Sequence, residues 1–247
     1  MRLQRFVIRI ITVVGAIGLW WFLTAVVWAD NRVLASVGPG DAIPSMWDML
    51  TSSDGWSDIR ASLGRLLLGL LIAFVIGVPL GILFGTYPAV EDAATPIVNF
   101  LRMISPLAWA PLVIVAFGVG TKPVVFLIAI TAVWPLVLGT SAGVRAIQPG
   151  WRAVTTSLGA SGTESLRFVT VPAVRGHVLT ALRLALGVAW IVLVPAEMLG
   201  VDSGLGYAVL NARDQLDYAA LGGAVLLIGV IGFILDTIFR TVLTNPH

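Results

Sequence analysis

The chain has 247 residues, of which 58% are hydrophobic and only 11% are charged, whereas about a quarter of an average soluble domain is charged. A soluble domain of this size cannot hide so much apolar surface, so the composition excludes most soluble enzymes and nucleic-acid binders. The net charge of +2 provides no basic stripe for nucleic acid. The chain has no cysteine and only two histidines, which argues against disulfides, thiol chemistry and a metal centre. We therefore expect an all-α integral membrane protein.

Uncharged runs of the length that a bilayer requires, roughly 20 residues, recur along the chain. Five of them cover residues 10–29, 66–90, 103–121, 123–144 and 218–235. A sixth run, 184–196, is shorter, but Arg183 and Glu197 at its ends can extend toward the membrane surfaces. The first run is longer than the apolar core of a signal peptide, so we expect it to be retained. The pattern predicts six transmembrane helices, with both termini on the same side.

The arginines indicate which side that is. Ten basic residues fall on the side of the N-terminus and of the loop 145–175, and the opposite side is acidic. The positive-inside rule therefore places both termini and this loop in the cytoplasm. The chain then divides into an N-terminal transmembrane helix (1–29), an extracytoplasmic amphipathic segment (30–64) with a short helix starting near Pro44, and a five-helix core (65–247).

The loop 145–175 has the pattern of two short helices joined at a glycine. Apolar residues at 151, 154 and 158 recur on one face of a first helix, and Gly159 suits a left-handed helix stop. Ser161 and Glu164 form the pattern of a capping box that starts a second helix, which we expect Pro172 to end. Its apolar side is supplied by Leu166, Phe168 and Val169. Such a loop either packs at the membrane surface or docks a cytoplasmic protein by placing a helix in a groove.

Other residues suggest a solute path. Pro106 and Pro111 are expected to break or kink the third span, and broken helices often frame such paths. The candidates for the path or its gate are Arg102, Ser105, Trp109, Trp134, Trp190 and Glu197. The tryptophans also suit packing or interfacial positions, and Glu197 is either a snorkelling charge, an outer gate or a contact to a binding protein. Two further patterns predict an ion pair between Asp236 and Arg240, and close helix packing along Gly69, Gly77, Gly81 and Gly85.

The segment Leu158-Gly159-Ala160-Ser161 through Val171-Pro172-Ala173 resembles the "EAA" loop of ABC importer permeases. Gly159 and Pro172 stand at matching places, whereas Ala153-Val154-Thr155 replaces the E-A-A start. Further motifs, in order, resemble the permeases of nitrate, sulfonate, taurine and bicarbonate importers. They are Ile43-Pro44-Ser45, Ser62-Leu63-Gly64-Arg65, Pro79-Leu80-Gly81, residues 102–112, Phe117-Gly118-Val119-Gly120, residues 182–187, Ala196-Glu197-Met198 and Gly204-Leu205-Gly206.

This resemblance implies the type I importer permease fold in the cell's inner membrane, with a cytoplasmic coupling helix that contacts the ATPase. The residues carried over to that role are Val154, Leu158, Gly159, Ala160, Ser161, Glu164, Leu166, Arg167 and Pro172. It also implies a homodimer of this chain, two ATP-binding subunits that hold ATP and Mg²⁺, and an extracytoplasmic solute-binding protein. The chain itself would be no enzyme and hold no cofactor, and the solute would be a small anion or organosulfonate or, alternatively, a pyrimidine-type vitamin precursor.

Two functions of other classes compete with this interpretation. A secondary transporter or channel without an ATPase predicts an inverted repeat and acidic residues in mid-span, and the sequence shows neither. A membrane-bound enzyme predicts a histidine, cysteine or paired-acid constellation, which is also missing.

Overall fold

The computed structural model describes residues 2–148, 150–151, 155, 157 and 159–243, and this part of the chain is helical without strands. Its contacts divide the chain into two compact units. Unit 1 is Met1–Ser62 with Asp202–Phe233, and unit 2 is Leu63–Val201 with Ile234–His247. Two long helices, α4 (Ser53–Thr86) and α12 (Tyr218–Leu243), begin in unit 1 and end in unit 2.

Unit 1 begins with the apolar helix α1 (Arg2–Phe22), which continues as the π-helix η1 (Leu23–Val27). Two short helices follow, α2 (Arg32–Ser36) and α3 (Pro39–Thr51). The unit also contains α11 (Leu205–Asp214). Side chains at the start of α4 satisfy the first amides of α11, because Asp58 accepts from Gly204 N at 2.6 Å and Ser62 from Leu205 N at 2.8 Å.

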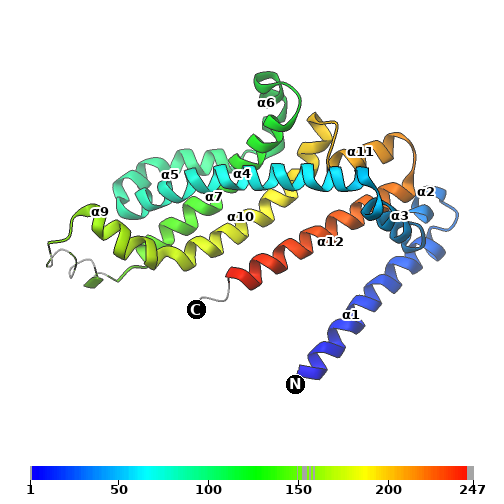
Figure 1. Ribbon diagram of the computed structural model, residues 1–247, viewed down its shortest axis with the longest axis horizontal. Helices are drawn as coiled ribbons and strands as arrows, with labels where there is room; N and C mark the ends of the chain where they lie inside the picture. Colours follow the sequence, from blue (N-terminus) through cyan, green and yellow to red (C-terminus); the bar gives the residue numbers. More distant parts are fainter. Residues whose placement is uncertain (1, 149, 152–154, 156, 158, 244–247) are drawn as a thin grey trace. The chain divides into compact units, whose positions relative to one another are not determined.

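Unit 2 contains α5 (Pro88–Met103), the 3₁₀ turn η2 (Pro106–Trp109), α6 (Ala110–Phe117) and α7 (Thr121–Arg145). Within the 145–175 loop a long continuous helix begins. It consists of α9 (Gly162–Ser165), the π-helix η3 (Leu166–Thr170) and α10 (Val171–Gly200). The core lies between α4, α7 and α10, which run side by side (Figure 1). Helix α7 is its centre, since most of its side chains are buried.

The glycines of α4 allow close packing against α7, as their four-residue spacing predicts. A Cβ on Gly69, Gly77, Gly81 or Gly85 would lie 2.5–2.8 Å from the side chains of Ile128, Leu136, Thr140 and Val144, respectively. Real Cβ atoms essentially never come so near, so only glycine permits this helix separation. The packing predicted for the stripe is thus found within one chain.

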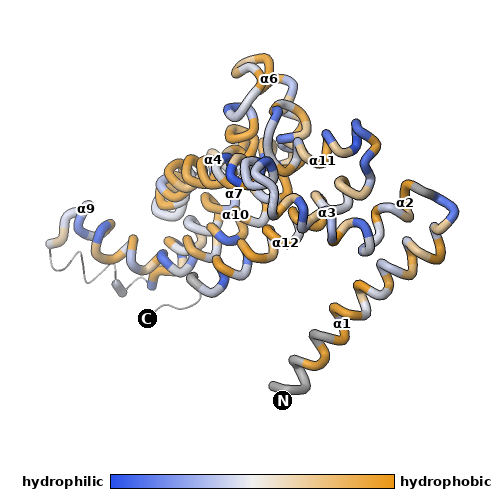
Figure 2. Tube along the Cα trace, turned by 45° about the vertical axis from the view of Figure 1, so that its right-hand side comes forward, coloured by the Kyte–Doolittle hydropathy of each residue, from blue (hydrophilic) through white to orange (hydrophobic). Residues whose placement is uncertain are grey.

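Four helices are long and apolar enough to cross a membrane: Ser53–Thr86, Thr121–Arg145, Gly162–Gly200 and Tyr218–Thr241. A fifth crossing is possible through α5 and the Pro106–Phe117 segment, which are bent by 85° at the break between them. A shorter apolar helix covers Ile11–Val27. Figure 2 shows hydrophobic residues along α4 and hydrophilic residues at α9. By length and composition, the described residues thus provide four candidate spans, or five with the bent pair.

Three predicted spans differ from the structure. The run 66–90 contains a break, because α4 ends at Thr86 and α5 begins at Pro88. The run 103–121 is no single helix, because α5 ends at Met103 and Pro106 starts a new turn. This agrees with the expected break at Pro106, whereas Pro111 fits the first turn of α6 without breaking it. The run 184–196 is only the middle of α10, and the charges that flank the run, Arg183 and Glu197, have partners on other helices.

Candidate functional site: a buried ion pair, a cavity and the 145–175 loop

An ion pair is buried inside unit 2. Arg65 of α4 donates from Nη1 to Oε1 of Glu197 on α10 at 2.7 Å, and the side chains are 6% and 0% exposed. Arg65 Nε also donates to the hydroxyl of Thr121, the first residue of α7, at 3.3 Å. The pair therefore joins α4, α7 and α10 at one level. Of the three interpretations of Glu197, the snorkelling charge is wrong, because the carboxylate is buried and pairs with an arginine of another helix.

The same end of unit 2 has a glycine loop between α6 and α7. Gly118 and Gly120 have φ of +75° and +125°, backbone conformations that favour glycine. Gly120 N donates to the carbonyl of Gly200, the last residue of α10, at 2.7 Å. This hydrogen bond joins the loop before α7 to the end of α10, in addition to the contacts of Arg65 with Thr121 and Glu197.

A cavity of 690 Å³ opens between the end of α5, η2, α7 and α10. Its wall includes Arg102, Trp109 and Trp134, three residues that the sequence singled out for a solute path. The rest of the wall is mainly apolar, from Leu101, Ile104, Pro106, Ile130, Pro135, Leu138, Leu184 and Val188, with Thr131 and Gly139. No acidic side chain is among these wall residues, and among the described residues Arg102 forms no ion pair. The cavity therefore presents one positive charge on an apolar surface.

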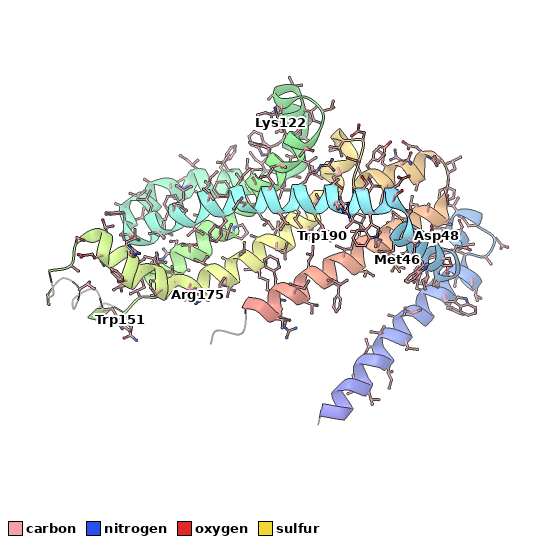
Figure 3. All side chains as sticks on the ribbon, viewed as in Figure 1. Met46, Asp48, Lys122, Trp151, Arg175 and Trp190 are labelled. Atoms are coloured by element: carbon pink, nitrogen blue, oxygen red, sulfur yellow. The ribbon has the colours of Figure 1, made fainter. Side chains whose placement is uncertain are left out.

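The remaining candidates for the path lie elsewhere. Ser105 is exposed in the break between α5 and η2. Trp190, labelled in Figure 3, is partly buried and packs against the core of unit 2. Glu197 belongs to the buried ion pair described above. The structure therefore brings together half of the candidate residues, and the break at Pro106 forms part of their cavity, as the sequence suggested.

The turn of the 145–175 loop has the predicted geometry. Gly159 has φ of +70°, in the left-handed region, and Ala160 N donates to the carbonyl of Thr155 at 3.0 Å. The capping box is complete: the Ser161 hydroxyl accepts from Glu164 N at 3.3 Å, and Glu164 Oε2 accepts from Ser161 N at 2.8 Å. Val154 and Leu158 lie outside the described residues.

The helix that follows the turn differs from the prediction at Pro172. The helix Gly162–Gly200 has 39 residues and is therefore about 58 Å long, well beyond a bilayer core of about 30 Å. Pro172 was expected to end a separate helix. Instead it is the second residue of α10, directly after the π-helical turn η3, and the helix continues through it.

The first turns of this helix carry exposed apolar side chains. Leu166 is 41% exposed and Phe168 is 69% exposed, and the guanidinium of Arg167 lies 5.6 Å from the centre of the Phe168 ring. A second cavity, of 390 Å³, lies beside them. It is lined by Ala146, Ile147, Gln148, Trp151, Phe168, Val169, Pro172 and Ala173, and Trp151 is labelled in Figure 3. In this part of the loop, hydrogen bonds from Ser161 lower the pKa of Glu164, so the capping carboxylate stays ionised.

Two further ion pairs lie on unit 2. Arg145 at the end of α7 donates to Glu91 of α5. Arg183 of α10 donates to both carboxylate oxygens of Asp236 on α12, at 2.8 and 2.9 Å. The sequence predicted a pair of Asp236 with Arg240 and missed this bond to another helix. Among the described residues, no group of His, Cys, Asp and Glu side chains is suited to a metal ion.

Comparison with known proteins identifies the family. The sequence profile described as "Binding-protein-dependent transport system inner membrane component" matches residues 77–245, more than two thirds of the chain. The chain belongs to this family. The taurine transport system permease protein TauC of Escherichia coli (strain K12) is 35% identical over 181 residues, which are 73% of this chain and 66% of TauC. The match thus covers slightly less than two thirds of that relative.

Two other comparisons cover more of the chain. The nitrate import permease protein NrtB of Leptolyngbya laminosa is 30% identical over 231 residues, 90% of this chain and 81% of that protein. A chain of the inward-facing MetNI methionine ABC transporter superposes with a TM-score of 0.65 at 18% identity, covering 81% of this permease-family chain and 96% of the other. At that identity the superposition establishes the fold alone. The family match contains α7, the described part of the 145–175 loop and α10.

Arg65 is the functional candidate that sequence reasoning missed. It was noted only as the last residue of the motif Ser62-Leu63-Gly64-Arg65, while Glu197 was considered without a partner. The two residues are 132 positions apart, so no helical spacing relates them. The available signal was that an uncompensated acid in an apolar segment requires a cation, and Arg65 is the basic residue at the start of the second uncharged run.

Proposed function

We propose that this chain is the membrane-spanning subunit of an ATP-driven importer, which passes a solute delivered by an extracytoplasmic binding protein. The family match over 77–245 supports this proposal. We further propose two copies of the chain per transporter and two separate ATP-binding subunits, which supply ATP and Mg²⁺. The chain itself acts as a pathway and is not catalytic.

The proposed topology has six spans. The apolar helix Ile11–Val27 is the first, and α5 with the bent Pro106–Phe117 segment is the third. The four long apolar helices supply the others. With six spans, the arginine-rich N-terminus and the 145–175 loop both lie in the cytoplasm.

The observation that carries the proposal is the geometry of the 145–175 loop. The loop contains a left-handed glycine and a capping box, and these are followed by a helix whose first turns expose apolar side chains. The same helix continues as the span α10. An ATPase that binds Leu166 and Phe168 can therefore move α10 as a rigid body, because no break separates the exposed turns from the membrane-spanning part. Movement of the ATPase is then coupled to movement of the span, because the docking site and the span belong to one continuous helix.

The cavity beside Arg102 is proposed as part of the solute path. The relatives are named for taurine, bicarbonate and nitrate transport, and all three solutes carry an anionic group. A single guanidinium without an acidic neighbour in the wall attracts such a group. We infer a small anion or organosulfonate as the solute. A pyrimidine-type vitamin precursor is the alternative, and uptake assays with both solute classes distinguish them.

The test replaces Gly159 by proline. Proline requires φ near −65°, so it is incompatible with the +70° of Gly159 and destroys the turn. We expect the Gly159→Pro chain to insert into the membrane but to lose solute uptake while its ATPase subunits continue to hydrolyse ATP. The matched control is Gly162→Pro, because Gly162 is the first residue of α9, where proline fits, and the preceding Ser161 is extended. Normal uptake by Gly159→Pro would contradict the coupling role of this loop.

A further inference from the structure

Helix α3 packs against the beginning of α12 in unit 1 along one narrow face. A Cβ on Gly222 would lie 3.1 Å from the Cβ of Ala42, and one on Gly223 would lie 2.8 Å from the backbone nitrogen of Met46. Ala42 is fully buried and Met46 is half-buried. The two glycines thus let α3 lie directly on the backbone of α12. This contact fixes the position of α3 along the axis of α12.

The two exposed flanks of α3 differ in chemistry. Ile43 and Trp47, four residues apart and therefore on one side of the helix, are 45% and 64% exposed. Asp41 and Asp48, seven residues apart, are exposed on the other flank. Met46 and Asp48 are labelled in Figure 3. The helix therefore has a packed face, an apolar flank and an acidic flank.

The level of α3 along α12 coincides with the edge of a bilayer. The candidate span Tyr218–Thr241 has 24 residues and is about 36 Å long, only slightly longer than a hydrocarbon core of about 30 Å. Gly222 lies four residues, or about 6 Å, from the start of α12. Helices that lie in the membrane interface sit at this boundary, with apolar side chains buried about 5–10 Å. The packing of α3 on α12 therefore places it at the boundary between headgroups and acyl chains.

We propose that α3 is an interfacial helix whose Ile43–Trp47 flank inserts into the lipid bilayer, while Asp41 and Asp48 face water. Tryptophan is the residue enriched at this boundary, because its ring is apolar and its N–H is polar. A second exposed tryptophan supports this placement: Trp56, at the start of α4, is 48% exposed, and its indole N–H donates to the carbonyl of Leu50 in α3 at 2.9 Å. Both tryptophans therefore belong to the same short connection at the membrane surface.

The proposal requires only that α12 cross a membrane. It does not depend on an ATPase, on the solute or on the 145–175 loop. The helix would hold the start of α12 at a fixed depth, since any vertical movement of that span would pull an apolar flank into water or an acidic flank into lipid. Failure of the importer proposal and failure of this one are therefore separate outcomes.

The test uses the absence of cysteine from the chain. Single-cysteine variants Ile43→Cys and Trp47→Cys, with Asp41→Cys and Asp48→Cys as matched controls on the same helix, are labelled with a nitroxide in the purified full-length chain. The protein is reconstituted in vesicles of phosphatidylethanolamine and phosphatidylglycerol, and collisions with oxygen and with a nickel chelate are measured. We expect positions 43 and 47 to collide mainly with oxygen, and positions 41 and 48 mainly with the chelate. Equal exposure of all four positions to the chelate would overturn the proposal.

A second measurement distinguishes lipid from a protein partner. The same unlabelled variants are treated in native membranes with a maleimide that cannot cross or enter the bilayer. Cysteines at 41 and 48 should react rapidly, and those at 43 and 47 should react slowly until detergent removes the lipid. Slow reaction at 43 and 47 that persists in detergent would mean that protein covers this flank, and would refute its insertion into lipid.

Discussion

Removal of Glu197 should destabilise the protein strongly, because it leaves a buried arginine without its counter-charge. The side chains of the pair are 6% and 0% exposed and are joined at 2.7 Å. Breaking a buried pair by removing one partner costs about 3–5 kcal/mol. One kcal/mol corresponds to about 2–4 °C in Tm for domains of 150–250 residues. For Glu197→Ala we therefore expect a fall in Tm of roughly 6–20 °C, measured on purified protein in detergent.

Two controls separate the charge from the cavity that the substitution creates. The double variant Arg65→Met with Glu197→Leu replaces both charges by apolar groups and should recover most of the loss, because apolar replacement of a whole buried pair is often neutral. Asp214→Ala breaks an exposed pair, with side chains 57% and 60% exposed, and should change Tm by less than about 4 °C. The reasoning is refuted if Glu197→Ala resembles Asp214→Ala, or if the double variant is less stable than either single one.

Three further predictions concern other parts of unit 2. Gly81→Ala should lower Tm by roughly 2–12 °C, as expected for overpacking by about 1–3 kcal/mol, since its Cβ would lie 2.6 Å from that of Thr140. Gly64→Ala, in the same helix but with open space around it, should not lower Tm, and equal losses would refute the close packing. The pKa of Glu164 lies below its ordinary value of 4.5, so the cap is present above that pH and is lost as the pH falls through the lowered pKa. Protection of the α9 amides from hydrogen exchange, corrected for intrinsic exchange, should therefore fall in that acidic range. It should not fall in Glu164→Gln, which has no carboxyl group to titrate. Arg102→Gln should reduce uptake of an anionic solute by about 10-fold or more, as for loss of a charged hydrogen bond, and unchanged uptake would remove Arg102 from the path.

Sequence reasoning succeeded where the determining physics is local. The glycine spacing in α4 predicted close packing, because residues four apart share one face of a helix whatever lies opposite. The turn at Gly159 and the box of Ser161 and Glu164 depend only on backbone conformation and on side chains three residues apart. These features were therefore predicted to the residue, and the structure has them at those positions.

The features that sequence reasoning missed depend on partners that are distant in the chain. Neither the pair of Arg65 with Glu197 nor that of Arg183 with Asp236 follows from any helical spacing. A charge with a partner on a neighbouring helix can lie inside a span, so the uncharged run 184–196 did not show where α10 begins and ends. The helix continues through Pro172 directly after a π-helical turn, for which the apolar pattern has no signature.

The central claim, that this chain is the permease of an ATP-driven importer, is tested most directly by co-purification. The chain is extracted from its native host in mild detergent, and the proteins that accompany it are identified by mass spectrometry. We predict an ATP-binding subunit that is present with the full chain and lost when residues 151–168 are deleted. Recovery of a stable chain alone, without any ATPase, would contradict the account and favour a transporter or channel that works without ATP.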